Sequence, residues 1–262
     1  MTVMNFSMII EKIYRYSDKV VIGARMIHLI ENNRNSVWSE VCTVIGRYKL
    51  DQISFYIKEF TSNSSSILIL GCPTDIQKDI NKTFKNVEFL DFSNSDGLKK
   101  SLKNKDQYQL ILIPFLGIMS VIDHEEQENI LKILRDYIIP SGKLVFDVDI
   151  PDMQVMLCDP ATTFFEHQIY NDQKSGSIII NTQRDYDEYT QTINLNIFVE
   201  FLDPSGAVER KIMNQIFSRY TFRWEMYNLL LLCGYKSIDL YGDYEGNYFS
   251  ENSHSMIWVS SF

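Results

Sequence analysis

Short apolar runs alternate with amphipathic segments between residues 67 and 150. The runs ILIL, VEFLDF, YQLILIPF and GKLVFDVDI are rich in Ile, Leu, Val and Phe, and they predict β-strands. The segments TDIQKDINKTF, SDGLKKSLKN and EEQENILKILRDYI separate them and place apolar residues at helical spacing. Near-continuous apolar runs are typical of strands that are covered on both faces. The alternation therefore predicts an α/β fold with a doubly wound, mostly parallel sheet.

The regions on either side of this segment have different patterns. Residues 6–60 repeat apolar positions every three or four residues, which predicts N-terminal helices. Residues 162–217 carry β-branched runs separated by turn signals at residues 174–176 and 203–206, which predict an inserted antiparallel β cap. A helix ending near Gly234 and two strands close the chain. We therefore expect an N-terminal helical lid (1–62), an α/β core (63–161 and 218–262) and a cap (162–217).

Composition and charge narrow the classes of partner. The formal net charge of -9 argues against a nucleic acid or an anionic membrane surface as the main partner, because proteins that bind those surfaces usually carry basic faces. The four cysteines are scattered and form no pair with redox or metal-site spacing, so reduced thiols are expected. No apolar run has the ~18 to 20 residues that span a bilayer. These features predict a cytoplasmic protein.

A glycine turn follows the first strand of the predicted core. Gly71 ends the run ILIL and precedes a helix, the arrangement that receives adenosine-type cofactors. Asp91 follows 20 residues later at the end of the next strand, where an acidic side chain can accept hydrogen bonds from ribose hydroxyls. Residues 114–116 end the strand YQLILIPF, and ligands bind open α/β sheets beyond the carboxyl ends of the strands. The structural alternatives are a loop-capping role for Asp91 and core packing for residues 114–116.

Four stretches in this order make the chain resemble class I S-adenosylmethionine (SAM)-dependent methyltransferases of the small-molecule type. They are ILILGCPTD, the strand ending at Asp91, the segment from YQLILIPF to VFDVDIPD, and SRYTFRWEMYNLLLLCGYKSIDLYGDYEGNYF. The resemblance covers about residues 37–262. It implies SAM as cofactor and transfer of its methyl group to an N or O atom of a small molecule. It also implies these cofactor contacts: Gly71, Cys72, Asp91, Pro114, Phe115 and Leu116.

The sequence departs from the pattern of these methyltransferases in the glycine turn and in the length of the core. Ile69 stands at an acidic position of the motif, and Pro73 and Asp75 stand where further glycines are usual. Pro73 removes an N–H donor, and a Cβ restricts how closely the backbone approaches a ligand. Only 37 residues separate Gly71 from Tyr108. This length holds a helix, a strand and a helix, but not the further strand–helix unit that these methyltransferases usually have there. We therefore expect the sheet to lack one edge strand.

These departures leave three functional hypotheses. The first is a methyltransferase with a remodelled adenosine pocket. The second is a protein of the same fold that does not use SAM and binds another small molecule or a protein. The third is an enzyme of this fold that catalyses a rearrangement or cyclisation without methyl transfer.

Residues on the substrate side are predicted from strand ends and from the cap. Asp147 and Asp149 alternate in VFDVDIPD, and Asp149, nearer the strand end, is the candidate catalytic residue that would orient a substrate or accept its proton. His167, Tyr170 and Arg219 are the candidate substrate-binding residues. The alternatives are a paired or capping carboxylate for Asp149, solvated strand positions for His167 and Tyr170, and a structural Arg219 that ties the cap to the core. Strands in the cap could also pair across a homodimer. No metal site is predicted.

Overall fold

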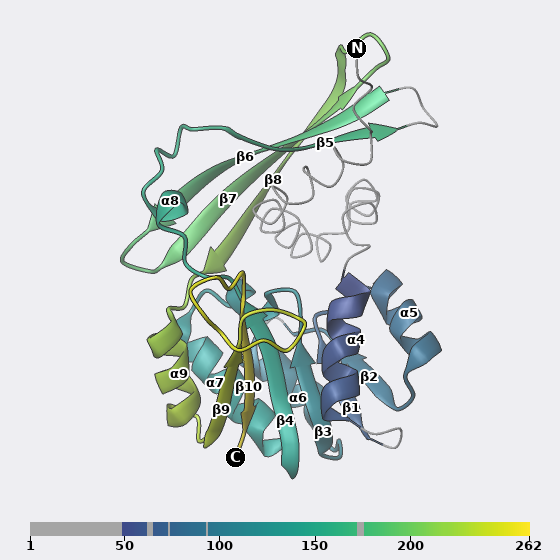
Figure 1. The fold of residues 1–262 in the computed structure, drawn as a ribbon, viewed down its shortest axis with the longest axis vertical. Coiled ribbons are helices and arrows are strands. Elements are labelled where there is room, and N and C mark those ends of the chain that lie inside the picture. Colours follow the sequence, from purple (N-terminus) through teal and green to yellow (C-terminus); the bar gives the residue numbers. More distant parts are fainter. Residues whose placement is uncertain (1–48, 62–64, 73, 93, 172–175) are drawn as a thin grey trace, which may run out of the picture.

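The computed structural model describes residues 49–61, 65–72, 74–92, 94–171 and 176–262. Figure 1 shows two parts: a sheet flanked by helices in the lower half of the view, and a second sheet above it. The lower part is the predicted α/β core, and the upper part is built from the inserted segment.

The core sheet has six strands in the order β2-β1-β3-β4-β10-β9. The first four strands of this order are parallel, and β10 runs antiparallel between β4 and β9. In the described residues β2 forms one edge of the sheet and is the one strand between β1 and β3 in the chain. The predicted mostly parallel sheet that lacks one edge strand is therefore confirmed. The strands are β1 (Ile67–Leu70), β2 (Val87–Leu90), β3 (Tyr108–Ile113), β4 (Ile138–Val148), β9 (Ser237–Tyr241) and β10 (Met256–Ser261).

Helices cover both faces of this sheet, which explains why its central strands are apolar at nearly every position. On one face, α4 (Lys49–Phe60) and α5 (Thr74–Thr83) pack in a cluster that includes Ile57, Ile69 and Ile80. On the other face, α6 (Ser95–Leu102), α7 (His124–Asp136) and α9 (Arg223–Leu232) pack in a second cluster that includes Leu68 and Leu134. All four residues of β1 are buried as a result.

The second sheet is an antiparallel meander that forms the cap. Its strands are β5 (Phe164–Asn171), β6 (Gly176–Asp187), β7 (Thr192–Leu202) and β8 (Val208–Arg219), in that order across the sheet. In β7 every second residue from Ile193 to Val199 is buried and the intervening residues are half-buried. This alternation is typical of a sheet with one face on a core, and it confirms the inserted antiparallel cap.

Arg219, at the end of β8, fastens the cap to the core. Its guanidinium donates hydrogen bonds to the side chains of Gln127 on α7 (3.3 Å), Gln191 in the β6–β7 turn (2.5 Å), Thr221 (3.2 Å) and Glu225 on α9 (2.5 Å). Arg219 is 7% exposed, and a buried guanidinium needs such partners because burial removes its hydration. These bonds agree with the structural alternative for this residue.

Two short helices were not predicted. The 3₁₀ helix η2 (Gly117–Ser120) follows β3, and α8 (Met153–Met156) follows β4, so both lie at the carboxyl edge of the core sheet. Of the predicted N-terminal lid, the structure describes α4 and Thr61. Residues 1–48 and 62–64 lie outside the described residues.

Candidate cofactor and active site

The glycine turn after β1 has the backbone conformation that its sequence predicts. Gly71 has a φ of +66°, in the left-handed region that glycine enters without steric cost. Its N–H donates to the carbonyl of Leu90 (2.9 Å), so the ends of β1 and β2 are adjacent. Among the described residues, a Cβ added at Gly71 would meet the ring of Phe92, at 3.5 Å. The turn therefore presents an open backbone surface at the carboxyl edge of the sheet.

Asp91 and Phe92 follow β2 and border this surface. The side chain of Asp91 is exposed, and the structure gives it no hydrogen bond or ion pair within the described residues, so it is available as an acceptor. The ring of Phe92 lies between two turns, since it is also 3.8 Å from a Cβ placed at Gly117. Cys72 is buried, and its carbonyl accepts a hydrogen bond from the Gln77 side chain (2.6 Å). Pro73 and the side chain of Asp75 lie outside the described residues.

The turn after β3 is strained. Phe115 and Leu116 have φ values of +61° and +58°, which cost an L-residue other than glycine roughly 1–2 kcal/mol each. Their side chains pack in opposite directions. Phe115 joins the apolar cluster on the α4 face, and Leu116 joins the cluster on the α7 face. Backbone strain of this kind persists only where the surroundings hold it, and it is common at binding sites.

Asp147, near the end of β4, contacts this turn. Its carboxylate is 3% exposed; Oδ1 accepts a hydrogen bond from the N–H of Leu116 (3.0 Å), and Oδ2 accepts one from the hydroxyl of Tyr244 (2.5 Å). Tyr244 comes from the loop between β9 and β10. One carboxylate thus joins the end of β3, the end of β4 and a loop near the C-terminus.

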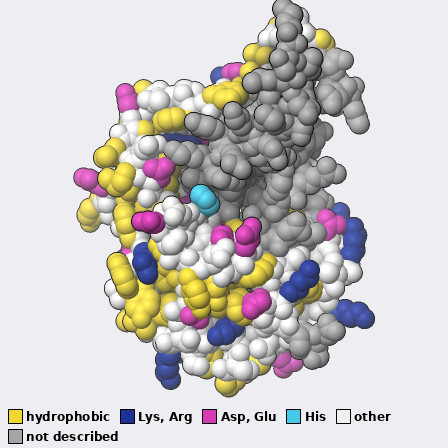
Figure 2. Space-filling view, viewed as in Figure 1, with side chains coloured by type: hydrophobic (Ala, Val, Ile, Leu, Met, Phe, Trp, Pro, Cys, Tyr) yellow, Lys and Arg dark blue, Asp and Glu magenta, His cyan; other side chains and the backbone are white. Residues whose placement is uncertain are grey.

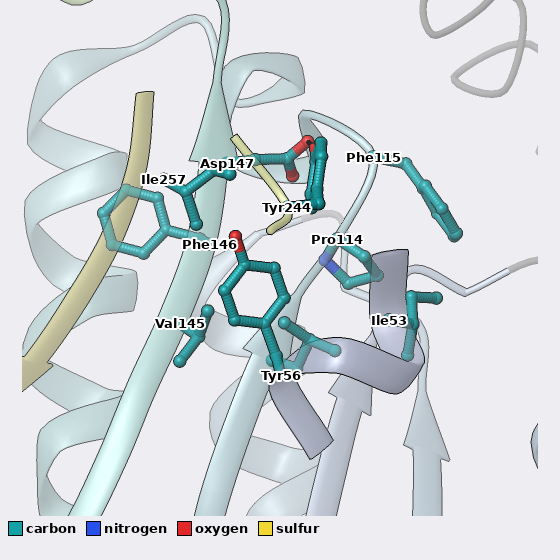
Figure 3. A pocket seen from close by; sticks show the side chains of 10 residues that line it. Ile53, Tyr56, Pro114, Phe115, Val145, Phe146, Asp147, Tyr244 and Ile257 are labelled. Atoms are coloured by element: carbon teal, nitrogen blue, oxygen red, sulfur yellow. Dashed lines mark hydrogen bonds between the residues drawn. The ribbon is translucent and has the colours of Figure 1, made fainter. Parts of the chain in front are cut away.

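Side chains fill the space at the β3–β4 end of the edge. Figure 3 shows Tyr56 of α4, Pro114, Phe115, Asp147 and Tyr244 around a small cavity. Its volume is about 10 Å³, which is room for about one water molecule. The rings of Tyr56 and Tyr244 meet edge to face with 5.8 Å between their centroids. A ligand that reached this cavity would have to displace aromatic side chains.

Asp149 lies just beyond the end of β4 and is 2% exposed. Its N–H contacts the sulfur of Met119 at 3.3 Å. Tyr220, at the junction of cap and core, is also buried. Burial raises the pKa of Tyr220 well above its ordinary value, and the negative charges of Asp149 and Asp152 add to the shift. The Tyr220 hydroxyl therefore stays protonated near the Asp149 carboxylate at neutral pH.

The predicted site residues divide into separate groups in the structure. Gly71, Cys72 and Asp91 gather at the β1–β2 end, and Pro114, Phe115 and Leu116 at the β3 end. Arg219 has the four side-chain partners described above. His167 and Tyr170 lie in β5, but their side chains are outside the described residues. The described residues also contain no cluster of His, Cys, Asp and Glu that could hold a metal ion.

The groups at the β1–β2 end have the chemistry that binds a nucleoside: an open backbone turn and a carboxylate that accepts hydrogen bonds. The left-handed glycine leaves the backbone open, and the exposed Asp91 carboxylate is at the adjacent strand end. Phe92 supplies an apolar surface beside both. The fit does not extend to the small cavity at the β3–β4 end, which the protein's own side chains occupy.

Sequence reasoning missed Asp147, Tyr244 and Tyr56 as residues of this edge. Asp147 was set aside in favour of Asp149 because Asp149 is nearer the strand end. Asp147, however, is the carboxylate that bonds the strained turn. The buried carboxylate inside an apolar strand was the available signal, since such a group requires partners. Tyr244 belongs to the YGDY stretch, whose pairing with β4 across 97 residues no local pattern indicates.

Comparison with solved protein structures identifies the fold of the chain, whereas comparison of sequences does not. No protein-family model and no curated protein sequence matches the chain. Solved structures of SAM-dependent methyltransferases do match. One from Clostridium acetobutylicum has a TM-score of 0.65 at 11% identity, covering 87% of this chain and 99% of that one. SAM-bound CalS10 from Micromonospora echinaspora, an amino pentose methyltransferase, has a TM-score of 0.63 at 12% identity, covering 87% and 98%.

A third match is KedS8, a sugar N-methyltransferase from Streptoalloteichus, with a TM-score of 0.57 at 10% identity, covering 82% of this chain and 87% of that one. These matches agree with the mixed α/β architecture, namely the mostly parallel core sheet and the inserted antiparallel sheet. The chain has the fold of class I SAM-dependent methyltransferases, with a six-stranded core sheet in the described residues.

Proposed function

We propose that the protein transfers a methyl group from SAM to an N or O atom of a small molecule. The observation that carries the proposal is the pairing of the left-handed Gly71 with the exposed Asp91 at adjacent strand ends of a methyltransferase-type sheet. Both are where an open α/β sheet binds a nucleoside.

The residues at this edge have distinct roles in the proposal. The backbone at Gly71 and Cys72 borders the adenosine, Asp91 accepts hydrogen bonds from the ribose hydroxyls, and the turn at residues 114–116 bounds the site on the β3 side. SAM supplies a methyl group made electrophilic by a positive sulfur. The protein then has mainly to align the acceptor atom and exclude water, which requires few dedicated catalytic groups.

We propose an amine of a sugar-like molecule as the acceptor. Similarity to an amino pentose methyltransferase and to a sugar N-methyltransferase supports this class. In this proposal Asp149, which is buried near the neutral Tyr220 hydroxyl, would hold the amine or accept its proton. His167 and Tyr170 would contact the acceptor from β5. The hydrogen bonds of Arg219 favour a structural role, in which it orients the cap over the core.

A small-molecule acceptor in the cytoplasm also agrees with the surface. Figure 2 shows Lys and Arg side chains scattered over the described part of this face, with acidic side chains among them. A nucleic-acid partner would favour a continuous basic patch. Within the described residues, none of the helices has the length and apolarity needed to cross a bilayer.

Calorimetric titration with S-adenosylhomocysteine (SAH) tests the proposal. We expect micromolar affinity for the wild type and a loss of at least tenfold, roughly one charge-assisted hydrogen bond, for Asp91→Ala. Asp96→Ala, which removes another exposed carboxylate on α6, is the matched control and should bind like the wild type. No heat of binding for the wild type at millimolar SAH would overturn the proposal.

The filled cavity at the β3–β4 end favours a second candidate function. In it the protein keeps the fold but binds a different small molecule or a protein, or converts its substrate without methyl transfer. Two measurements separate the candidates. A co-purified adenosyl ligand in native mass spectrometry of the purified protein supports the methyltransferase. Substrate conversion in an assay without SAM supports the alternative.

We also propose that two copies associate through the cap. Phe165, Phe198 and Met213 lie in one row on the same face of the sheet, by the register of β5 to β8. Phe165 and Met213 are 63% and 59% exposed, and Phe217 on the same face is 47% exposed. Burial of this face in a second copy would remove apolar surface from water. Light scattering should show a dimer that Met213→Lys dissociates, and a monomeric wild type would contradict the proposal.

A further inference from the structure

One buried carboxylate forms a hydrogen bond with the turn that follows β3. Asp147 accepts the N–H of Leu116 on Oδ1 and the hydroxyl of Tyr244 on Oδ2, from two segments far apart in the chain. Within the described residues, no Lys, Arg or His nitrogen is within ion-pair distance of this carboxylate. Its two hydrogen-bond donors here are a backbone amide and a phenol.

The turn needs this support because its sequence does not favour its conformation. Phe115 and Leu116 are consecutive left-handed residues, and neither is glycine or asparagine. Their side chains are anchored on opposite faces of the sheet, so a change of backbone conformation would pull one of them out of its cluster. The bond from the Leu116 amide to Asp147 fixes the backbone between the two anchors.

Tyr244 is itself held in place from two sides. Asp243 accepts hydrogen bonds from the N–H groups of Glu245 (2.9 Å) and Asn247 (3.1 Å), which shapes the loop. On α4, the hydroxyl of Tyr56 donates to the Asp243 carbonyl (3.5 Å), and its ring packs edge to face on that of Tyr244. Figure 3 shows Tyr56, Tyr244 and Asp147 side by side. The loop, α4 and the ends of β3 and β4 thus form one connected unit.

This unit reaches the glycine turn through Phe92. The ring of Phe92 is 3.5 Å from a Cβ placed at Gly71 and 3.8 Å from one placed at Gly117, the residue after Leu116. The strained turn therefore lies against the same ring that borders the open backbone of Gly71. A shift of the turn would move the ring and change the shape of the adenosine surface.

We propose that Asp147 and Tyr244 are positioning residues for the cofactor. They hold the turn at residues 114–116 in its left-handed conformation and so set the affinity of the site, without touching the ligand. The inference rests on the proposed function, because it assigns these residues to the same SAM site. Neither residue was a predicted site residue from the sequence.

A double-mutant cycle with SAH tests the inference. Tyr244→Phe removes one hydroxyl and should weaken SAH binding about tenfold, the effect of one hydrogen bond to a charged group. If Tyr244 acts through Asp147, Tyr244→Phe should cause no further loss in an Asp147→Ala background. Tyr248→Phe is the matched control, because Tyr248 is 67% exposed and its ring stacks on Tyr241. If Asp147→Ala does not fold, Asp147→Asn replaces it in the cycle.

Hydrogen exchange of the Leu116 amide gives a readout that does not depend on the ligand. This amide should be protected in the wild type and in Tyr248→Phe, and exchange at least tenfold faster in Tyr244→Phe. A wild type that fails to bind SAH would overturn the proposed function. Normal SAH affinity in Tyr244→Phe, or additive losses in the cycle, would overturn the positioning role while leaving the proposed function intact.

Discussion

The two ends of the carboxyl edge of the core sheet differ in how much of their own structure fills them. At the β1–β2 end a left-handed glycine, an exposed Asp91 and the rim of Phe92 leave backbone and carboxylate accessible. At the β3–β4 end buried aromatic rings and a buried carboxylate leave room for about one water molecule. The described part of the glycine turn thus leaves its backbone open, while side chains fill the neighbouring strand ends.

The difference suggests that the two ends contribute in different ways. The β1–β2 end, here called the open end, can supply contacts to a ligand directly. The β3–β4 end, here called the closed end, can affect ligand binding indirectly. A packed and strained turn transmits small displacements to the residues beside it. Among the described residues of the glycine turn, only Gly71 has the left-handed backbone torsion that favours glycine, and the sequence retains this glycine.

The largest expected effect is the difference in stability loss when a phenylalanine at each end is replaced by alanine. Phe115 at the closed end is 5% exposed, whereas Phe92 at the open end is half-buried. We expect Phe115→Ala to lower the free energy of unfolding by about 3–5 kcal/mol and Phe92→Ala to lower it by about 1–2 kcal/mol, in proportion to the area each ring buries. Urea denaturation measures both. Equal losses would show that the two ends are packed alike, and the comparison would fail.

Gly71 tests whether the open end binds the ligand directly. Gly71→Ala places a Cβ at a left-handed position and should cost about 1 kcal/mol of stability from the backbone, since among the described residues the added atom is no closer than 3.5 Å to a neighbour, the Phe92 ring. Gly206→Ala is the matched control, because Gly206 has a φ of +86° in a cap turn with nothing within 4 Å of its added Cβ.

Both glycine variants should therefore lose similar stability in urea denaturation, but only Gly71→Ala should lose SAH affinity in calorimetry. Loss of affinity in both would mean that the effect of Gly71→Ala comes from general destabilisation. Loss in neither would mean that the open end does not contact the ligand.

Local patterns predicted the open end better than the closed end. Apolar runs and turn residues specified β1, Gly71 and the strand before Asp91, because each depends on residues adjacent in the chain. The short spacing after Gly71 and the resemblance to the methyltransferase fold predict a mostly parallel sheet without one edge strand, and the described residues form such a sheet. The order of the strands was not predicted.

The closed end depends on contacts that local sequence does not encode. Whether Asp147 or Asp149 meets the turn after β3 depends on the point where β4 ends, and a difference of two residues decides it. Tyr244 and Tyr56 reach the site from a loop and a helix 188 positions apart, so only tertiary packing brings them together. The left-handed Phe115–Leu116 pair had no sequence signal at all, because such torsions are usually found at glycine and asparagine.

Acid pH should loosen the closed end, and this is the smallest of the three expected effects. Burial works to raise the pKa of Asp243, but hydrogen bonds from the Asn247 side chain and from the amides of Glu245, Asn247 and Gly246 outweigh it, and its pKa lies below the ordinary value of 3.8. A depressed folded-state pKa stabilises the protein above the unfolded-state value, and this contribution is lost as the pH falls through the folded-state pKa.

The measurement is the difference in melting temperature between wild type and Asp243→Asn as a function of pH. The wild type should be the more stable of the two above about pH 5, and the difference should shrink below about pH 4 as Asp243 takes up its proton. Other carboxylates titrate in both proteins and cancel in the difference. Because Asp243 shapes the loop that carries Tyr244, exchange of the Leu116 amide should accelerate over the same pH range, after correction for the intrinsic rate. A pH-independent difference would show that the loop does not depend on the charge of Asp243, and the closed end would then be held by packing alone.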